Sequence, residues 1–167
     1  DAAGKAVRYP FGHGLSYARF AYSGLSVQRA GEQLVVRCRI ENVGSMTAAE
    51  TVQLYLAPPR KVAFAPPQIL TGFARRTLAP GEAAEITFTL TRRDVSYYSP
   101  AGKCWKVEGG VYELRLGASS RDIRLRAAIE WPGDDVCPAD AANWAACPHY
   151  AKVDGVFPKE EFERWYR

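Results

Sequence analysis

The segment at residues 78–90 constrains the fold more than any other part of the chain. It begins with the turn sequence LAPGE, in which Pro80 suits the second position of a type II turn and Gly81 suits the left-handed third position. In residues 84–90 every second residue is apolar and the residues between them are polar or charged. This period of two is typical of a strand that lies half-buried against a core.

The same alternation recurs in short segments that are separated by turn residues. We expect strands at residues 20–28, 34–42, 51–57, 69–77, 82–90, 111–117 and 123–131, with a short extra strand at 104–107 and a turn or short helical crossing at 94–99. Short strands at this spacing predict an all-β fold, an antiparallel two-sheet sandwich of the immunoglobulin or fibronectin III type. A chain of 167 residues can bury such a core without disulfides.

These patterns divide the chain into three parts. Residues 1–16 form an extended lead-in, residues 17–131 form the sandwich, and residues 132–167 form an irregular tail. The tail ends in a short helix at about residues 158–166, because Pro158 suits the first helical position and acidic residues follow in the first turn. A helix this short needs a surface to pack on, so we expect the tail to link to another domain or to pack against one.

Composition excludes several classes of partner. The chain has 22 Lys and Arg against 18 Asp and Glu, a net charge of +4, and its basic residues are scattered without interleaved aromatics, so no nucleic-acid partner is expected. No apolar run is long enough to span a membrane.

The chain does not begin with Met, and we expect it to be a fragment or a processed product. It carries no signal peptide, which favours the cytoplasm without fixing the compartment.

The four cysteines do not predict a metal site. They form no CxxC pair, so no zinc site, other metal site or cofactor is assigned. Cys38 is in phase with apolar neighbours along its strand and is expected to be a buried small hydrophobe. Cys137 and Cys147 could close a small loop or stay reduced, and we favour free thiols.

A series of motifs points to a family. In chain order they are YPFGHGLSY at residues 9–17, ENVG at 41–44, VQLYL at 52–56, LTGF at 70–73, LAPGE at 78–82, DVSYY at 94–98 and LGASSRD at 116–122. The series resembles the fibronectin type III-like domain of glycoside hydrolase family 3, the β-glucosidases and β-xylosidases, over residues 9–131. Residues 150–166 are similar to a segment of those members in which this module precedes the barrel domain.

The resemblance implies a parent enzyme that hydrolyses β-linked glucosides or xylosides with retention, using an Asp nucleophile and a Glu acid/base. The family's nucleophile motif, a Ser-Asp-Trp-like stretch, does not occur here. We therefore assign no catalytic residue and expect this chain alone to be inactive. The resemblance leaves it a supporting role beside the α/β and barrel domains of the parent, or in a homodimer.

Aromatic residues of the lead-in and the tail are the candidates for contact with those domains. They are Tyr9, Phe11, His13, Tyr17, Phe162, Trp165 and Tyr166. His13 has no nucleophile or carboxylate near it in sequence, so a structural or interdomain role is favoured over that of a general base.

Three other groups of residues have alternative interpretations. Asp134 is adjacent to Asp135, and Glu160 is adjacent to Glu161. The acids of both pairs are expected to point into water rather than to form a glycosidase pair. Tyr97, Tyr98, Trp105 and Tyr112 could stack on sugars, but packing is favoured, with Tyr112 in the core and the other two tyrosines tying down backbone at a sheet corner. Arg37, Arg39, Arg115, Arg124 and Arg126 are expected to form a basic sheet face, which is either solvated or in contact with an acidic partner.

The favoured function is thus a non-catalytic accessory module of a β-glucosidase-like enzyme. Two alternatives from other classes stay open, an independent carbohydrate-binding module and a cell-surface adhesion module.

Overall fold

The structure, a computed structural model, describes residues 6–59, 66–99 and 102–135. The expectations for the short terminal helix, for Phe162, Trp165 and Tyr166, for the acids Glu160 and Glu161, and for the pair Cys137 and Cys147 lie outside the described residues.

The described residues form strands joined by turns, with one short 3-10 helix. In chain order these elements are β1 (Phe20–Ala30), β2 (Gln33–Asn42), β3 (Ala48–Ala57), β4 (Ile69–Leu78), β5 (Ala83–Leu90), η1 (Arg92–Val95), β6 (Ser96–Ser99), β7 (Cys104–Val107), β8 (Gly110–Gly117) and β9 (Ile123–Trp131). Every predicted strand is present, with ends that differ by a few residues. The crossing expected at residues 94–99 is wrong in part, because Ser96–Ser99 pairs with Cys104–Val107 as a strand.

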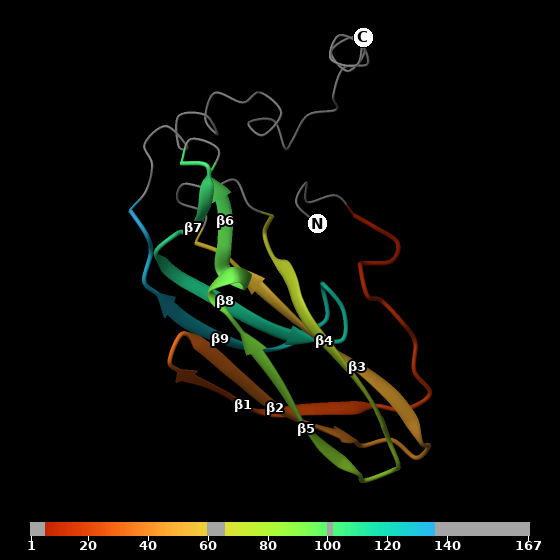
Figure 1. The fold of residues 1–167 in the computed structure, drawn as a ribbon. Helices are drawn as coiled ribbons and strands as arrows, with labels where there is room; N and C mark the ends of the chain where they lie inside the picture. The colour runs from red at the N-terminus through yellow and green to blue at the C-terminus, as the bar shows by residue number, and fades with distance from the viewer. Residues whose placement is uncertain (1–5, 60–65, 100–101, 136–167) are drawn as a thin grey trace, which may run out of the picture.

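The strands form two facing layers and a hairpin. One layer has the order β1-β2-β5 and the other the order β4-β3-β8-β9, and every strand pair is antiparallel. The hairpin β6-β7 stands at one end of the two layers (Figure 1). The predicted antiparallel sandwich is confirmed. Within the described ranges no helix has the length and hydropathy that a membrane crossing requires.

The core lies between the layers, where the inward residues of each strand meet. Val52, Leu54 and Leu56 of β3 are fully or almost fully buried, as the alternation predicted. Cys38 of β2 is also buried, and this burial raises the pKa of its thiol to about 11. Its role as a small core hydrophobe is confirmed.

The turn before β5 has the predicted geometry. Gly81 has a φ of +75°, and the Glu82 N–H donates to the Ala79 carbonyl at 3.0 Å, as a type II turn requires. The Gly81 N–H also donates to the carbonyl of buried Asn42 at the end of β2. The first of these hydrogen bonds closes the turn, and the second ties it to the end of β2.

Candidate interdomain surface

The lead-in lies against the outer face of the four-stranded sheet. The Ser120 N–H, in the turn between β8 and β9, donates to the Phe11 carbonyl at 2.9 Å. The Gln53 side-chain amide of β3 donates to the Gly12 carbonyl at 3.3 Å. In Figure 1 this segment is the red trace that runs beside the sandwich toward β1.

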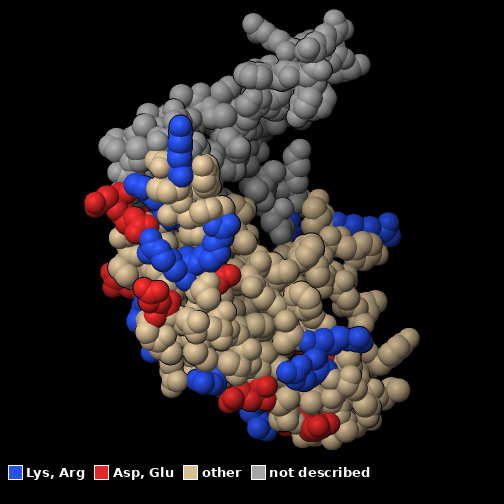
Figure 2. Space-filling model, in the orientation of Figure 1, with Lys and Arg blue, Asp and Glu red and all other residues tan. Residues whose placement is uncertain are grey.

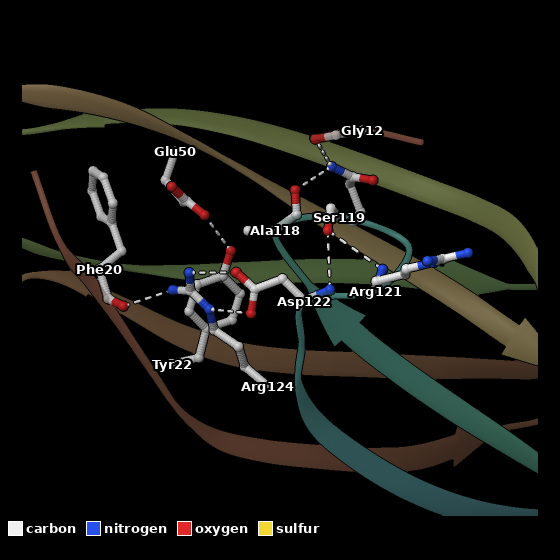
Figure 3. A network of polar contacts seen from close by, with 10 residues as sticks. Gly12, Phe20, Tyr22, Glu50, Ala118, Ser119, Arg121, Asp122 and Arg124 are labelled. Carbon is white, nitrogen blue, oxygen red and sulfur yellow. Dashed lines mark hydrogen bonds and ion pairs between the residues drawn. The ribbon is translucent and has the colours of Figure 1, made fainter. Parts of the chain in front are cut away.

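Gln53 connects three parts of the chain. Besides Gly12, its Nε2 donates to the Ala118 carbonyl at 2.7 Å, and its Oε1 accepts from the Tyr55 hydroxyl. The carbonyl groups of Gly12 and Ala118, both labelled in Figure 3, accept hydrogen bonds from this amide. Gln53 and Tyr55 are 5% and 3% exposed although both point away from the core. The lead-in and the β8-β9 turn thus bury polar groups that would otherwise face water.

The close approach at this point requires glycine. Gly12 has a φ of +76°, and a Cβ there would lie 2.2 Å from Gln53 Oε1. A side chain at position 12 would therefore clash with Gln53 and also strain the backbone.

The predicted contact residues of the lead-in are left uncovered. Tyr9 stacks on His13 with ring centroids 5.3 Å apart, and both residues are exposed. Phe11 is largely exposed and Tyr17 is 93% exposed. Two apolar residues that sequence reasoning did not select share this property, Leu15 (95%) and Phe73 (69%). Leu15 lies within the lead-in motif, and Phe73 falls at an outward position of β4. Both residues could therefore have been selected as contact candidates from the sequence pattern.

Two hollows open on this outer face. One, of about 210 Å³, is lined by apolar groups that include Phe11, Tyr55 and Leu70. The other, of about 180 Å³, is lined by groups that include Leu15 and Arg75. Neither hollow is lined by a pair of carboxylates.

A polar network closes one side of the sandwich near the lead-in. The Tyr22 hydroxyl of β1 donates to Glu50 Oε1 of β3 at 2.6 Å, and the Arg124 guanidinium of β9 lies over the Tyr22 ring at 4.7 Å (Figure 3). Arg124 also donates to the Phe20 carbonyl at 2.8 Å and to Asp122. Burial, followed by the bond to Glu50, raises the pKa of Tyr22. These contacts join both sheets and are structural.

The acids near the end of β9 do not form a glycosidase pair. The expectation that Asp134 points into water is wrong, because Arg92 and the Val107 N–H both donate to its carboxylate and lower its pKa. Asp135 is exposed, as expected. Among the described residues no group of three or more His, Cys, Asp and Glu side chains is arranged to hold a metal ion.

The aromatic residues at the hairpin pack against neighbours rather than forming a flat platform. Tyr112 is 1% exposed, and its hydroxyl donates to the Glu108 carbonyl at 2.7 Å and to the Val95 carbonyl at 3.2 Å, so this core tyrosine ties down backbone. The Arg93 guanidinium covers one face of Trp105 at 3.2 Å, and Tyr98 meets that ring at 69°. A sugar ring needs an open aromatic face, which the covered face of Trp105 does not offer.

Comparison with known proteins identifies the sandwich. Residues 50–120 match the family described as Fibronectin type III-like domain. The β-glucosidase of family 3 from Bifidobacterium adolescentis has a similar structure, with a TM-score of 0.78 and 40% identity over 93% of this chain and 24% of that one. The sandwich is a fibronectin type III-like domain of glycoside hydrolase family 3.

Two further relatives of this fibronectin type III-like domain are also glycosidases. An exo-α-(1→6)-L-arabinopyranosidase of Bifidobacterium longum is 36% identical over 159 residues, which cover 92% of the chain and 21% of that protein. Thermostable β-glucosidase B of Acetivibrio thermocellus is 39% identical over 133 residues, 77% of the chain and 18% of that protein. The chain therefore spans about a fifth of the curated relatives that it matches.

The outward arginines of the fibronectin type III-like domain do not form one basic face. Arg37 and Arg39 lie on β2 of the three-stranded sheet, while Arg115, Arg124 and Arg126 lie on the other sheet. Each has an acidic neighbour, and those carboxylates are Glu85, Glu41, Glu113 and Asp122. Figure 2 shows basic and acidic side chains interspersed on the visible face. The prediction of a basic face is wrong because strand order separates the arginines and carboxylates neutralise them.

Proposed function

We propose that this domain is the non-catalytic accessory part of a retaining β-glycosidase whose substrate is a β-linked glucoside. The observation that carries the proposal is the match to about a fifth of each relative. Most of such an enzyme, including the carboxylates that would cleave the substrate, would lie in other domains. The names of the relatives support this substrate class, since several are β-glucosidases.

The structural uses of two described carboxylates also support a non-catalytic role. Retaining glycosidases need two carboxyl groups about 5–5.5 Å apart across a sugar-sized cleft. Here Glu50 accepts from Tyr22, and Asp134 accepts from Arg92. Both acids are engaged in holding segments of the sandwich together.

The lead-in is the proposed contact with the α/β and barrel domains of the parent. Tyr9, Phe11, His13 and Tyr17 are exposed, yet the segment that carries them is hydrogen-bonded to the sheet at Gln53 and Ser120. Exposed aromatics on a fixed segment are suited to an interface, because little entropy is lost when they dock. A homodimer is the alternative use of the same surface.

Assays on aryl glycosides test the proposal. The 167-residue chain and the complete parent enzyme are incubated separately with an aryl β-glucoside, an aryl β-xyloside and an aryl α-L-arabinopyranoside. We expect the parent to hydrolyse the β-glucoside fastest and the chain alone to hydrolyse none of the three. Hydrolysis by the chain alone would contradict the accessory role, and a parent that prefers another glycoside would contradict the substrate class.

A further inference from the structure

Three rows of facing residues define the outer face of β3 and β4. Register pairs Tyr55 with Leu70 in one row, Gln53 with Phe73 in the next and Thr51 with Arg75 in the third. In an antiparallel pair, directly opposite side chains lie about 4.5–5.5 Å apart at Cβ. Gln53 and Phe73 thus occupy the middle row.

The two hollows flank this middle row. The larger hollow is lined by Tyr55, Leu70 and Phe11, and the smaller one by Thr51, Arg75 and Leu15. The lead-in passes over Gln53 between them, since Gly12 receives the Gln53 hydrogen bond. Leu15 and Phe73, which are 95% and 69% exposed, are therefore parts of one outer surface whose shape depends on where Gln53 holds the lead-in.

We propose that Gln53 is a positioning residue that locks the lead-in on the sheet, so that Leu15, Phe73 and the two hollows form a preformed docking surface for the neighbouring domain of the parent enzyme. The proposal rests on the proposed function for the identity of this partner. Contact through a preformed surface avoids the cost of ordering the lead-in at the moment of docking.

Three observations favour a domain of the same polypeptide as the occupant. Whatever precedes residue 6 is joined to the sandwich through the lead-in, which crosses this face. The chain spans about a fifth of the relatives it matches, so a relative-sized parent has enough further polypeptide to cover the face. Arg75 forms no ion pair with any described residue, so a carboxylate of the partner would complement it at the edge of the smaller hollow.

The first test concerns the lock itself and uses the 167-residue chain. Gln53→Leu removes the donor to Gly12 and Ala118. We expect the Ser120 amide, which donates to the Phe11 carbonyl, to exchange with D2O about tenfold faster, as the loss of a hydrogen bond worth about 1.4 kcal/mol would allow. Unchanged exchange at Ser120 in a folded variant would overturn the lock.

Gln68→Leu is the matched control for this variant. Gln68 is also on the outer side, and its amide donates to the Ser120 carbonyl at 2.7 Å, while Arg115 donates to its oxygen. The Gln68→Leu variant therefore loses one hydrogen bond to the β8-β9 turn and one from Arg115. We expect the exchange of the Ser120 amide to rise less than in Gln53→Leu, because Gln68 is bonded to the turn and to Arg115 but not to the lead-in.

Gly12→Ala tests the lock without changing the sheet. Its Cβ would meet Gln53 Oε1, so we expect the lead-in to leave the face and the Ser120 amide to exchange faster, as in Gln53→Leu. Gly31→Ala is its control, because Gly31 has a similar φ of +62° but nothing within 4 Å of the added methyl group. Equal exchange at Ser120 in the two alanine variants would overturn the lock, even if Gln53→Leu failed to fold.

The second test concerns the docking and uses the complete parent. Hydroxyl-radical footprinting compares the modification rates of Leu15 and Phe73 in the parent with those in the 167-residue chain, and we expect both rates to fall several-fold in the parent. Tyr98 and Trp105 are the internal controls, since they are about half exposed on the β6-β7 hairpin, at one end of the sandwich. Equal rates at Leu15 and Phe73 would overturn the docking, whichever glycoside the parent hydrolyses.

A second copy of the chain is the competing occupant. Sedimentation of the 167-residue chain is expected to show a monomer. A dimer in which Phe73 is protected from radicals would overturn the assignment of the partner to the parent's own domain. Failure of the glycoside assays would leave these footprinting results interpretable, so the two proposals can fail separately.

Discussion

The hydroxyl of Tyr112 offers a sharp test of how the end of the sandwich is held together. Tyr112 is 1% exposed, and its oxygen lies 2.7 Å from the Glu108 carbonyl and 3.2 Å from the Val95 carbonyl. Burial raises the pKa of this hydroxyl, so it keeps its proton and donates throughout the neutral range. Tyr112→Phe removes this donor while it keeps the ring that fills the core.

The cost follows from the environment of these groups. Removing one partner of a buried hydrogen bond costs about 1–3 kcal/mol, against about 0.5–1.5 kcal/mol for the net contribution of an average bond. Because the shorter contact involves a backbone carbonyl, we expect Tyr112→Phe to lower the free energy of unfolding by about 1–2 kcal/mol. With a urea m-value of about 2 kcal/mol per molar, in the middle of the usual range, the midpoint should fall by about 0.5–1 M.

Urea unfolding followed by tryptophan fluorescence measures the effect. Tyr98→Phe is the control, because Tyr98 is 47% exposed and keeps its ring contact with Trp105 when the hydroxyl is removed. We expect the control to lie within about 0.5 kcal/mol of the wild type. If Tyr112→Phe had the wild-type midpoint with an unchanged m-value, the hydroxyl would not be tying the backbone down, and the reasoning would be refuted.

Three further predictions concern the core, a thiol and a carboxylate. Leu54→Ala, at a fully buried position of β3, should lower the free energy of unfolding by about 2–5 kcal/mol in the same assay, and a loss under 1 kcal/mol would contradict its place in the core. In the folded chain a maleimide at pH 8 should label exposed Cys104 but not Cys38, whose thiol pKa is raised to about 11, as peptide mapping by mass spectrometry can check. Asp134→Asn should cost about 0.5–1 kcal/mol at pH 7, because Arg92 lowers the pKa of Asp134 in the folded state and this contribution is present above the unfolded value of about 4. It is lost as the pH falls through the lowered folded pKa, so the urea midpoints of variant and wild type should approach each other as the pH falls below about 4, and a constant difference would contradict the linkage.

The sandwich could be predicted from sequence because its core obeys a simple period. Strands buried on one side place apolar residues at every second position, and residues 84–90 follow this rule on β5. The strand β6 was missed because Ser96–Ser99 is four residues long and holds two serines and two tyrosines without apolar alternation. Its pairing with β7 is a tertiary contact that no local pattern predicts.

Charge pairing was the least predictable property. Outward arginines were assigned to a single face, but the strand order places β2 in one sheet and β8 and β9 in the other. Glu113 illustrates the consequence, because burial opposes its ionisation while hydrogen bonds from Arg126 and Arg115 outweigh this effect and lower its pKa. Which carboxylate meets which arginine depends on strand order and register, and neither is set by local composition.

The candidate surface was predicted only on its lead-in side, and β3 shows why. A strand covered on one face buries alternate residues, but β3 buries every residue from Val52 to Ala57. The sequence VQLYLA places a glutamine inside this run, and a buried amide is stable only when its hydrogen bonds are satisfied. Gly12, Ala118 and Tyr55 satisfy it here. A glutamine in an otherwise apolar strand is thus a sequence signal that a second segment covers the outer face, and the glycines of residues 9–17 indicate which segment can approach closely enough to do so.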